Sequence, residues 1–245
     1  MLSQRFPPGS VREALAAWVG TLLVLLALTL VGRAVPFLGQ LTGALAVAAF
    51  LWVPSWLLER RNLDAGDAGF RFDRWRRDLL WGLSACAVVL PVFTAGFLWF
   101  TAAVPALPDW LRGVIAPYLS GRGPLHGLPE AWDARLDILG RIAGNAAVAL
   151  AEEFFYRGWL TGQLEAAWPP GTKLLGVPFG RGALLANALF AAGHLLVLAP
   201  WRLATFFPGL LFAWLRARTG TVGASAVCHW LCNVWLLLLE AAAYG

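Results

Sequence analysis

Long apolar stretches, separated by short polar connections, run through the whole chain. The first extends from Ala14 to Val31 and contains no charged residue. A helix of about 20 apolar residues crosses the hydrocarbon core of a bilayer, and inside that core only helices and closed barrels satisfy their backbone hydrogen bonds. No strand pattern competes with the helical one, so the sequence predicts an all-α, polytopic transmembrane helix bundle.

The apolar stretches also set the expected number of membrane helices. We expect about seven, with six to eight compatible with the pattern, and a single membrane-embedded domain over residues 1–245. Only 13% of the residues are charged, whereas about a quarter are charged in soluble domains. The expected spans are 14–32, 36–58, 79–106, 138–164, 182–199, 202–217 and 221–241.

The distribution of arginine predicts the orientation. Most basic residues fall on the inner side when the N-terminus is placed inside, as expected for cytoplasmic loops. The net charge of +5 is therefore a topology signal, and we expect no nucleic-acid partner. The segment from Glu59 to Asp78 interleaves arginine with aromatic residues, so we expect it to contact anionic membrane lipids. A short extra helix between residues 109 and 137 would change the side of the C-terminus.

Glu152, Glu153 and Arg157 lie within the otherwise apolar stretch from Asn145 to Leu160. A charged side chain at the centre of a membrane helix costs about 2.5–3.5 kcal/mol, so such residues usually face the bundle interior and mark a function. Residues four apart share a helix face, whereas adjacent residues diverge by about 100°. We therefore expect Arg157 to pair with Glu153 and Glu152 to be free for chemistry.

Two later spans carry further polar residues at helical spacing. Asn187, Phe190 and His194 share one face of the first, and His229 and Asn233 share one face of the second. Each group alone has an ordinary structural explanation, because buried ion pairs and interhelical hydrogen bonds from asparagine are common. Together they indicate a site, provided that the three helices meet.

Glycines on the first of these helices bear on whether the helices meet. Gly140 and Gly144 form one G-x-x-x-G pair, and Gly158 and Gly162 form another. Such pairs allow neighbouring backbones to approach closely. We therefore expect this helix to pack tightly against its neighbours. His126, in the long outer loop, has no regular spacing to a partner, and we expect no functional role for it.

Hydrolysis suits one free carboxylate, two imidazoles and a carboxamide. Glu152 can act as the general base that takes a proton from water, and His194 can orient the same water. His229 and Asn233 can donate hydrogen bonds to the oxyanion that develops on a scissile carbonyl.

Other chemistries stay open at this point. Ser225, one turn before His229, or the adjacent Cys228 can act as a nucleophile with that histidine. Zinc can bind Glu152 or Glu153 together with His194 and His229, although the H-E-x-x-H signature is absent. The three cysteines fall inside apolar stretches and predict no disulfide framework.

At these positions the sequence resembles the CAAX protease and bacteriocin-processing (CPBP, or Abi) family of intramembrane endopeptidases. Its pattern has three motifs: E-E-x-x-x-R, met at 152–157; F-x-x-x-H, met at 190–194; and H-x-x-x-N, met at 229–233. The resemblance is close over a catalytic core at 138–241 and weaker back to about residue 68.

The resemblance implies the same roles: Glu152 and His194 on the water, His229 and Asn233 on the oxyanion, and Glu153 with Arg157 as the supporting pair. Both metal-dependent and glutamate-dependent mechanisms have been assigned to the family. We expect no cofactor, with zinc, on Glu152, His194 and His229, as the alternative. The expected substrate is a protein or peptide near the membrane surface, prenylated or not, and the expected location is a bacterial inner membrane with the N-terminus cytoplasmic.

Two rival functions fit the same residues. A non-catalytic immunity or interaction protein would keep the fold without the reaction. A small transporter would use the polar groups to bind a proton or substrate, but polar clusters in one half only argue against the inverted repeats typical of transporters. The sequence does not specify the oligomeric state.

Overall fold

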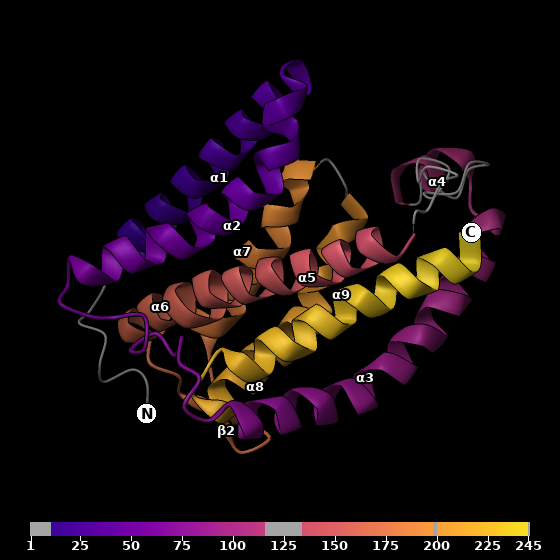
Figure 1. The fold of residues 1–245 in the computed structure, drawn as a ribbon. Coiled ribbons are helices and arrows are strands. Elements are labelled where there is room, and N and C mark those ends of the chain that lie inside the picture. The colour runs from indigo at the N-terminus through magenta and orange to yellow at the C-terminus, as the bar shows by residue number, and fades with distance from the viewer. Residues whose placement is uncertain (1–10, 116–133, 198–199, 245) are drawn as a thin grey trace.

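The computed structural model describes residues 11–115, 134–197 and 200–244. The all-α prediction is confirmed, since 83% of the structure is helical. Figure 1 shows the elements in chain order: α1 (Val11–Ala34), α2 (Pro36–Glu59), α3 (Trp75–Ala103), η1 (Val104–Ala106), α4 (Asp109–Ile115), α5 (Ala134–Glu153), η3 (Phe154–Leu160), α6 (Thr161–Ala167), β1 (Thr172–Leu174), β2 (Val177–Phe179), α7 (Arg181–Gly193), η4 (His194–Val197), η5 (Pro200–Thr205), α8 (Phe206–Thr219) and α9 (Gly223–Tyr244).

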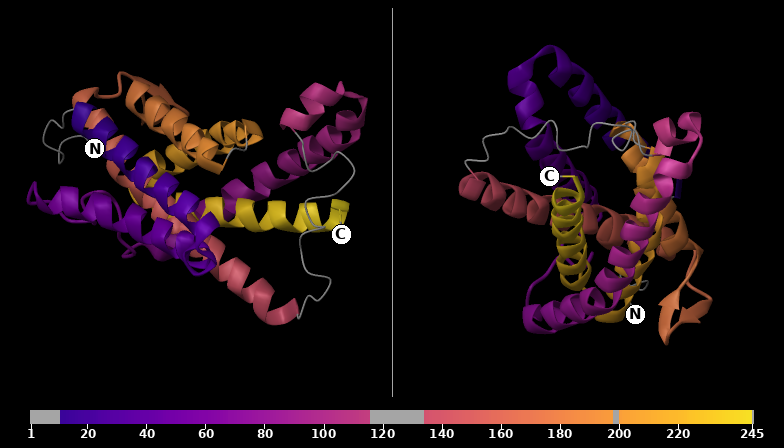
Figure 2. Two further views of the ribbon diagram at one scale, coloured as in Figure 1. Left: turned by 90° about the horizontal axis from the view of Figure 1, so that it is seen from above. Right: turned by 90° about the vertical axis from the view of Figure 1, so that its right-hand side faces the viewer.

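Helices α5 and α9 pack against each other in the middle of the structure. The α1–α2 hairpin covers α5 through α2, and α3 packs along α9 on the other side (Figures 1 and 2). Helix α7 packs against α6 and α8, and α8 in turn contacts α9. The second half of the chain therefore surrounds the junction between α5 and α9, where the predicted polar residues lie.

Three helices in the described ranges are long and apolar enough to cross a membrane: Val11–Ala34, Pro36–Glu59 and Trp75–Ala106. They indicate an integral membrane protein. Helices α7 and α8 have 13 and 14 residues, which at 1.5 Å per residue gives only about 20 Å of the roughly 30 Å that a span requires. The full set of seven spans therefore stays a prediction.

The expectation of no strand is wrong at one place. Strands β1 and β2 pair in an antiparallel hairpin whose two turn residues, Leu175 and Gly176, have φ of 48° and 78°. Two consecutive positive φ values are typical of the tight turn whose twist suits a hairpin. Three-residue strands are too short to show alternation in the sequence. The segment 109–137, which is long enough to contain a short extra helix, includes α4, whereas His126 lies outside the described residues.

The glycines at which the chain packs closely differ in part from the predicted ones. Space around Gly140 and Gly144 is open, so the first predicted G-x-x-x-G pair brings no neighbour close. A Cβ on Gly158 would lie 2.9 Å from the carbonyl oxygen of Ala68. On α3, a Cβ on Gly82 would lie 2.8 Å from Val227 Cγ1. Among the glycines of α3, the closest packing is therefore at Gly82, where α3 contacts α9.

The contact at Gly82 gives a stability prediction. Gly82→Ala should lower the free energy of unfolding by about 1–3 kcal/mol, because the added methyl group overpacks the α3–α9 contact. The matched control is Gly96→Ala on the same helix, where nothing lies within 4 Å of the added carbon. Thermal unfolding in detergent micelles measures both. Equal stability of the two variants would contradict the close packing.

Candidate active site

The helix that carries the first motif changes its winding at the motif itself. Helix α5 ends at Glu153, and the next seven residues, Phe154–Leu160, form the π-helix η3. The wider winding is braced by Thr161 Oγ1, which donates a hydrogen bond to the carbonyl oxygen of Tyr156, five residues back, at 2.8 Å. Every residue of η3 is buried. Short π-helical segments are rare and frequently mark functional sites.

A fully buried ion pair joins the two ends of this motif. Arg157 Nη1 lies 3.0 Å from Glu153 Oε1, and the side chains are 2% and 0% exposed. Arg157 Nη2 also donates to Asn187 Oδ1 at 3.2 Å and to the Gly209 carbonyl at 3.3 Å. Asn187 donates in turn to the carbonyl of Phe206 at 2.8 Å. The guanidinium therefore ties η3 to both α7 and α8.

His229 of α9 lies between the two glutamates. Its Nδ1 is 3.0 Å from Glu153 Oε1, and its Nε2 is 3.6 Å from Glu152 Oε2. An ionised carboxylate can only accept a hydrogen bond, so with Glu153 ionised against Arg157, Nδ1 carries a hydrogen and Nε2 faces Glu152. Glu153 thus holds both Arg157 and His229, a double role that spacing alone does not reveal. The side chain of Glu152 is 16% exposed, whereas that of Glu153 is 0% exposed.

His194 stands at the end of α7, where the helix changes to η4. Its Nδ1 lies 3.0 Å from the Phe190 carbonyl oxygen. Because a carbonyl only accepts, Nδ1 carries the hydrogen and Nε2 keeps its lone pair for another partner. The second motif, F-x-x-x-H, therefore sets the tautomer of its own histidine.

The ring of Phe190 brings the three motifs together. Its centroid lies 4.9 Å from the His194 ring and 5.7 Å from the His229 ring, both edge to face. The Arg157 guanidinium lies 4.0 Å from the same centroid. The helices of all three motifs therefore meet around one buried phenyl ring, as the hydrolysis hypothesis requires.

Sequence reasoning missed two residues of this cluster. Phe212 of α8 stacks on His229, with ring centroids 4.8 Å apart and planes 16° apart. Gly209, one turn earlier, leaves space for Asn187, because a Cβ there would collide with its Oδ1. Neither residue belongs to a motif, and their shared helix face in an apolar span is the only signal the sequence holds.

Two other candidate residues, Asn233 and Cys228, show no contact with the cluster in the described part of the chain, whereas the side chain of Ser225 lies against Glu153. Asn233 is half-buried on α9, one turn beyond His229. Ser225 Oγ donates to the carbonyl of Val222 at 3.0 Å, as serine in a membrane helix commonly does. Cys228 faces Cys86 of α3 instead of His229. The two nucleophile alternatives gain no geometric support.

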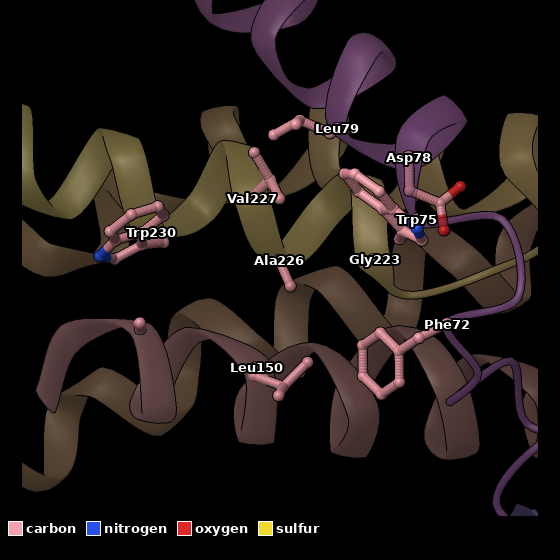
Figure 3. A pocket seen from close by; sticks show the side chains of 10 residues that line it. Phe72, Trp75, Asp78, Leu79, Leu150, Gly223, Ala226, Val227 and Trp230 are labelled. Atoms are coloured by element: carbon pink, nitrogen blue, oxygen red, sulfur yellow. The ribbon is translucent and has the colours of Figure 1, made fainter. Parts of the chain in front are cut away.

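Two cavities border the bundle. One, of about 290 Å³, lies between α1 and the end of α7 and is lined by Leu22, Leu26, Leu30, Ala192, Leu195 and others. Two of these, Ala192 and Leu195, lie two residues before and one residue after His194 in the chain. The other, of about 200 Å³, lies between α5, α9 and the start of α3 (Figure 3). Asp78 is the only ionisable group among the described residues that line it, and this carboxylate already accepts from Thr221 Oγ1 at 2.6 Å.

The proposed zinc ligands do not fit a zinc ion as they are arranged. Carboxylate and imidazole are suitable donors. Among the described residues, however, the one group of three or more His, Cys, Asp or Glu close enough to hold a metal consists of three cysteines, and Glu152, His194 and His229 do not form such a group. No step of the reaction is therefore derived through a metal.

Comparison with known proteins bears on the family. Residues 135–235 match the family model described as Rce1-like, type II CAAX prenyl endopeptidase Rce1-like. The expected resemblance is confirmed. The matched segment contains all three motifs and runs from the start of α5 through most of α9. No curated protein and no solved structure matches the chain. The match to this family model and the apolar helices together suggest a membrane peptidase.

The buried ion pair gives a second stability prediction. Arg157→Met should lower the free energy of unfolding by about 3–5 kcal/mol, because it leaves Glu153 charged and buried without its partner. The double variant Glu153→Gln, Arg157→Met should recover part of this loss, since neither charge then remains. Thermal unfolding in micelles measures both, with Arg74→Met at the exposed surface as control. A double variant less stable than Arg157→Met would contradict the interpretation.

Proposed function

We propose that this protein is an intramembrane endopeptidase that hydrolyses a peptide bond in a membrane-associated protein or peptide, using a water molecule activated by Glu152 and His194. The observation that carries the proposal is the meeting of the three motifs around Phe190, with His229 between the two glutamates. The Rce1-like match over the same residues supports it.

Glu152 is the general base in this proposal. It is the more exposed glutamate of the pair, so a water molecule and a scissile carbonyl can reach it. The carboxylate takes a proton from water as the oxygen attacks the carbonyl carbon. His194 Nε2 has its lone pair available and accepts a hydrogen bond from the second O–H of the same water, which orients the attacking oxygen. The proton on Glu152 then passes to the leaving amine, so the hydroxyl and the proton of one water end on the two products.

His229 and Asn233 form the oxyanion side. With a proton on each ring nitrogen, His229 donates from Nε2 to the negative oxygen that develops on the carbonyl, and the Asn233 amide, on the same face of α9, adds a second donor. Glu153 positions the ring by accepting from Nδ1. Stacking on Phe212 fixes the plane of the imidazole. A donor held in place before the reaction costs no reorganisation at the transition state.

The surroundings of His194 support an apolar substrate. The cavity of about 290 Å³ between α1 and α7 is lined by five leucines together with Ala192, Thr29 and Arg33, and one of the leucines, Leu195, follows His194 in the chain. An extended peptide anchored in the membrane, by an apolar segment or by a prenyl group, can place apolar parts there. We place the protein in a bacterial inner membrane with a cytoplasmic N-terminus, its arginine-rich segment against anionic lipids and about seven helices in the bilayer.

The general-base role gives the decisive test. Glu152→Gln should slow cleavage of a membrane-anchored peptide by about 10²–10⁴-fold, because the amide cannot take the proton of water. Purified protein in liposomes is given a fluorogenic peptide with and without a prenylated C-terminal cysteine. Glu59→Gln makes the same chemical change at an exposed position on α2 and should cleave like the native protein. Cleavage by Glu152→Gln at the native rate would reject the mechanism. No cleavage of either peptide by native protein would favour the immunity or transporter function.

The absence of a catalytic metal is tested separately. EDTA binds Zn²⁺ strongly, so a zinc enzyme should lose activity in its presence and regain it with added Zn²⁺. We expect the cleavage rate to be unchanged by EDTA, because the reaction uses only the carboxylate and the imidazoles. Initial rates before and after dialysis against EDTA provide the measurement. Loss of activity that Zn²⁺ alone restores would overturn the metal-free mechanism.

A further inference from the structure

The three cysteines of the chain come together although 142 residues separate the first from the second. Cys86 lies on α3, and Cys228 and Cys232 lie one turn apart on α9. Cys86 Sγ is 3.5 Å from Cys228 Sγ, and all three sulfur atoms lie within 4.8 Å of one another. A face of α9 that carries two thiols therefore meets a third thiol from the helix packed along it.

The thiol cluster lies in an apolar environment. Cys86 and Cys228 are buried and Cys232 is half-buried. The surrounding core includes Phe212, Leu215 and Ala224, with Trp81, Val89 and Leu231 packed against it. The cluster is separate from the candidate active site, because Cys228 and His229 diverge by about 100° around α9. His229 faces the glutamates of α5, while Cys228 faces α3.

We propose that Cys86, Cys228 and Cys232 form a binding site for one Cu⁺ ion. A metal–sulfur bond of about 2.3 Å places three sulfurs in a plane around an ion roughly 4 Å apart. The Sγ atoms of Cys86 and Cys228 are 3.5 Å apart, and no two of the three sulfur atoms are more than 4.8 Å apart, so a spacing of roughly 4 Å lies within the observed range. Thiols are soft ligands, and they select Cu⁺ or Zn²⁺ over the harder divalent cations.

The number of ligands favours Cu⁺ over Zn²⁺. Structural zinc is almost always bound by four ligands in a tetrahedron. In the described part of the chain the group holds three cysteines and no fourth His, Asp or Glu. Cu⁺ is stable with three sulfur ligands and needs no water to complete its coordination.

Metal binding changes the charge of the cluster. The thiolate is the form of cysteine that binds a metal, so each thiol that binds Cu⁺ gives its proton to solvent. The positive ion offsets part of the negative charge that the thiolates bring into the apolar core, where unpaired charge is expensive. No electron is transferred, since the ion enters as Cu⁺.

Metal stoichiometry and affinity test the proposal. The native protein in detergent micelles, kept anaerobic with ascorbate, is titrated with Cu⁺ against the competing chelator bicinchoninate. We expect one tightly bound Cu⁺ per chain. Cys86→Ala should weaken binding by about 10- to 100-fold or more, because losing a direct ligand costs at least as much as losing an outer-shell partner. Cys232→Ala, at the half-buried position, tests the third ligand without emptying the buried core.

Control variants separate the site from the catalytic residues. Glu152→Gln should bind Cu⁺ like the native protein, whereas a variant without all three cysteines should bind none tightly. Bound Cu⁺ should also raise the unfolding temperature of the native protein and not that of Cys86→Ala, since a ligand of the folded state stabilises it. Equal affinity in native protein and Cys86→Ala, or loss of binding in Glu152→Gln, would overturn the proposal. These readouts do not depend on protease activity, so they stand or fall separately from the proposed function.

Discussion

The buried pair of Glu153 and Arg157 is the interaction on which the rest of the site depends. Removing two charges from water costs several kcal/mol for each ion, and this cost is offset only when the geometry supplies further hydrogen bonds. Here Arg157 finds them on Asn187 and on the Gly209 carbonyl, and Glu153 finds one on His229. The pair can be buried only when α7, α8 and α9 have all packed against η3. Folding of the second half of the chain and assembly of the site are therefore the same event.

This arrangement separates two chemically identical neighbours. Glu153 is fully buried and occupied on one oxygen by a cation and an imidazole. Glu152 is partly exposed and faces the far nitrogen of the same imidazole, at 3.6 Å. Two carboxylates whose environments differ in this way are suited to different roles, one structural and one reactive. The change from α-helix to π-helix immediately after Glu153 also helps to give the two glutamates different surroundings, because the winding of the helix changes at this point.

The part of the site that depends on local spacing could be predicted from the sequence. Glu153 and Arg157 are four residues apart in an apolar helix, so their pairing follows from helix geometry and from the cost of leaving either charge unpaired in lipid. The grouping of His194 and His229 rests on the gathering of polar residues in the late apolar spans and on the motif resemblance, because nothing in local spacing says which helices meet. Phe190 shows how they do: one ring contacts both imidazoles and the guanidinium.

What could not be predicted depends on tertiary packing. The π-helix, the stacking of Phe212 on His229 and the clearance at Gly209 all require knowledge of which side chains meet across helices. The same limit explains the error at Gly140 and Gly144, whose spacing permits close approach although nothing lies within 4 Å of a Cβ added at either glycine. The short helices α7 and α8 show that an apolar stretch long enough for a span can be divided by 3₁₀ turns, here η4 and η5.

Helix α9 connects the two parts of the molecule that carry chemistry. Adjacent residues on a helix diverge by about 100°, so His229 turns to the glutamates of α5 while Cys228 turns to α3. Phe212 touches both environments, since it stacks on His229 and belongs to the apolar core around Cys228. Interiors packed as densely as crystals transmit small displacements. Phe212 therefore connects the packing of α3 on α9 with the imidazole that faces Glu152.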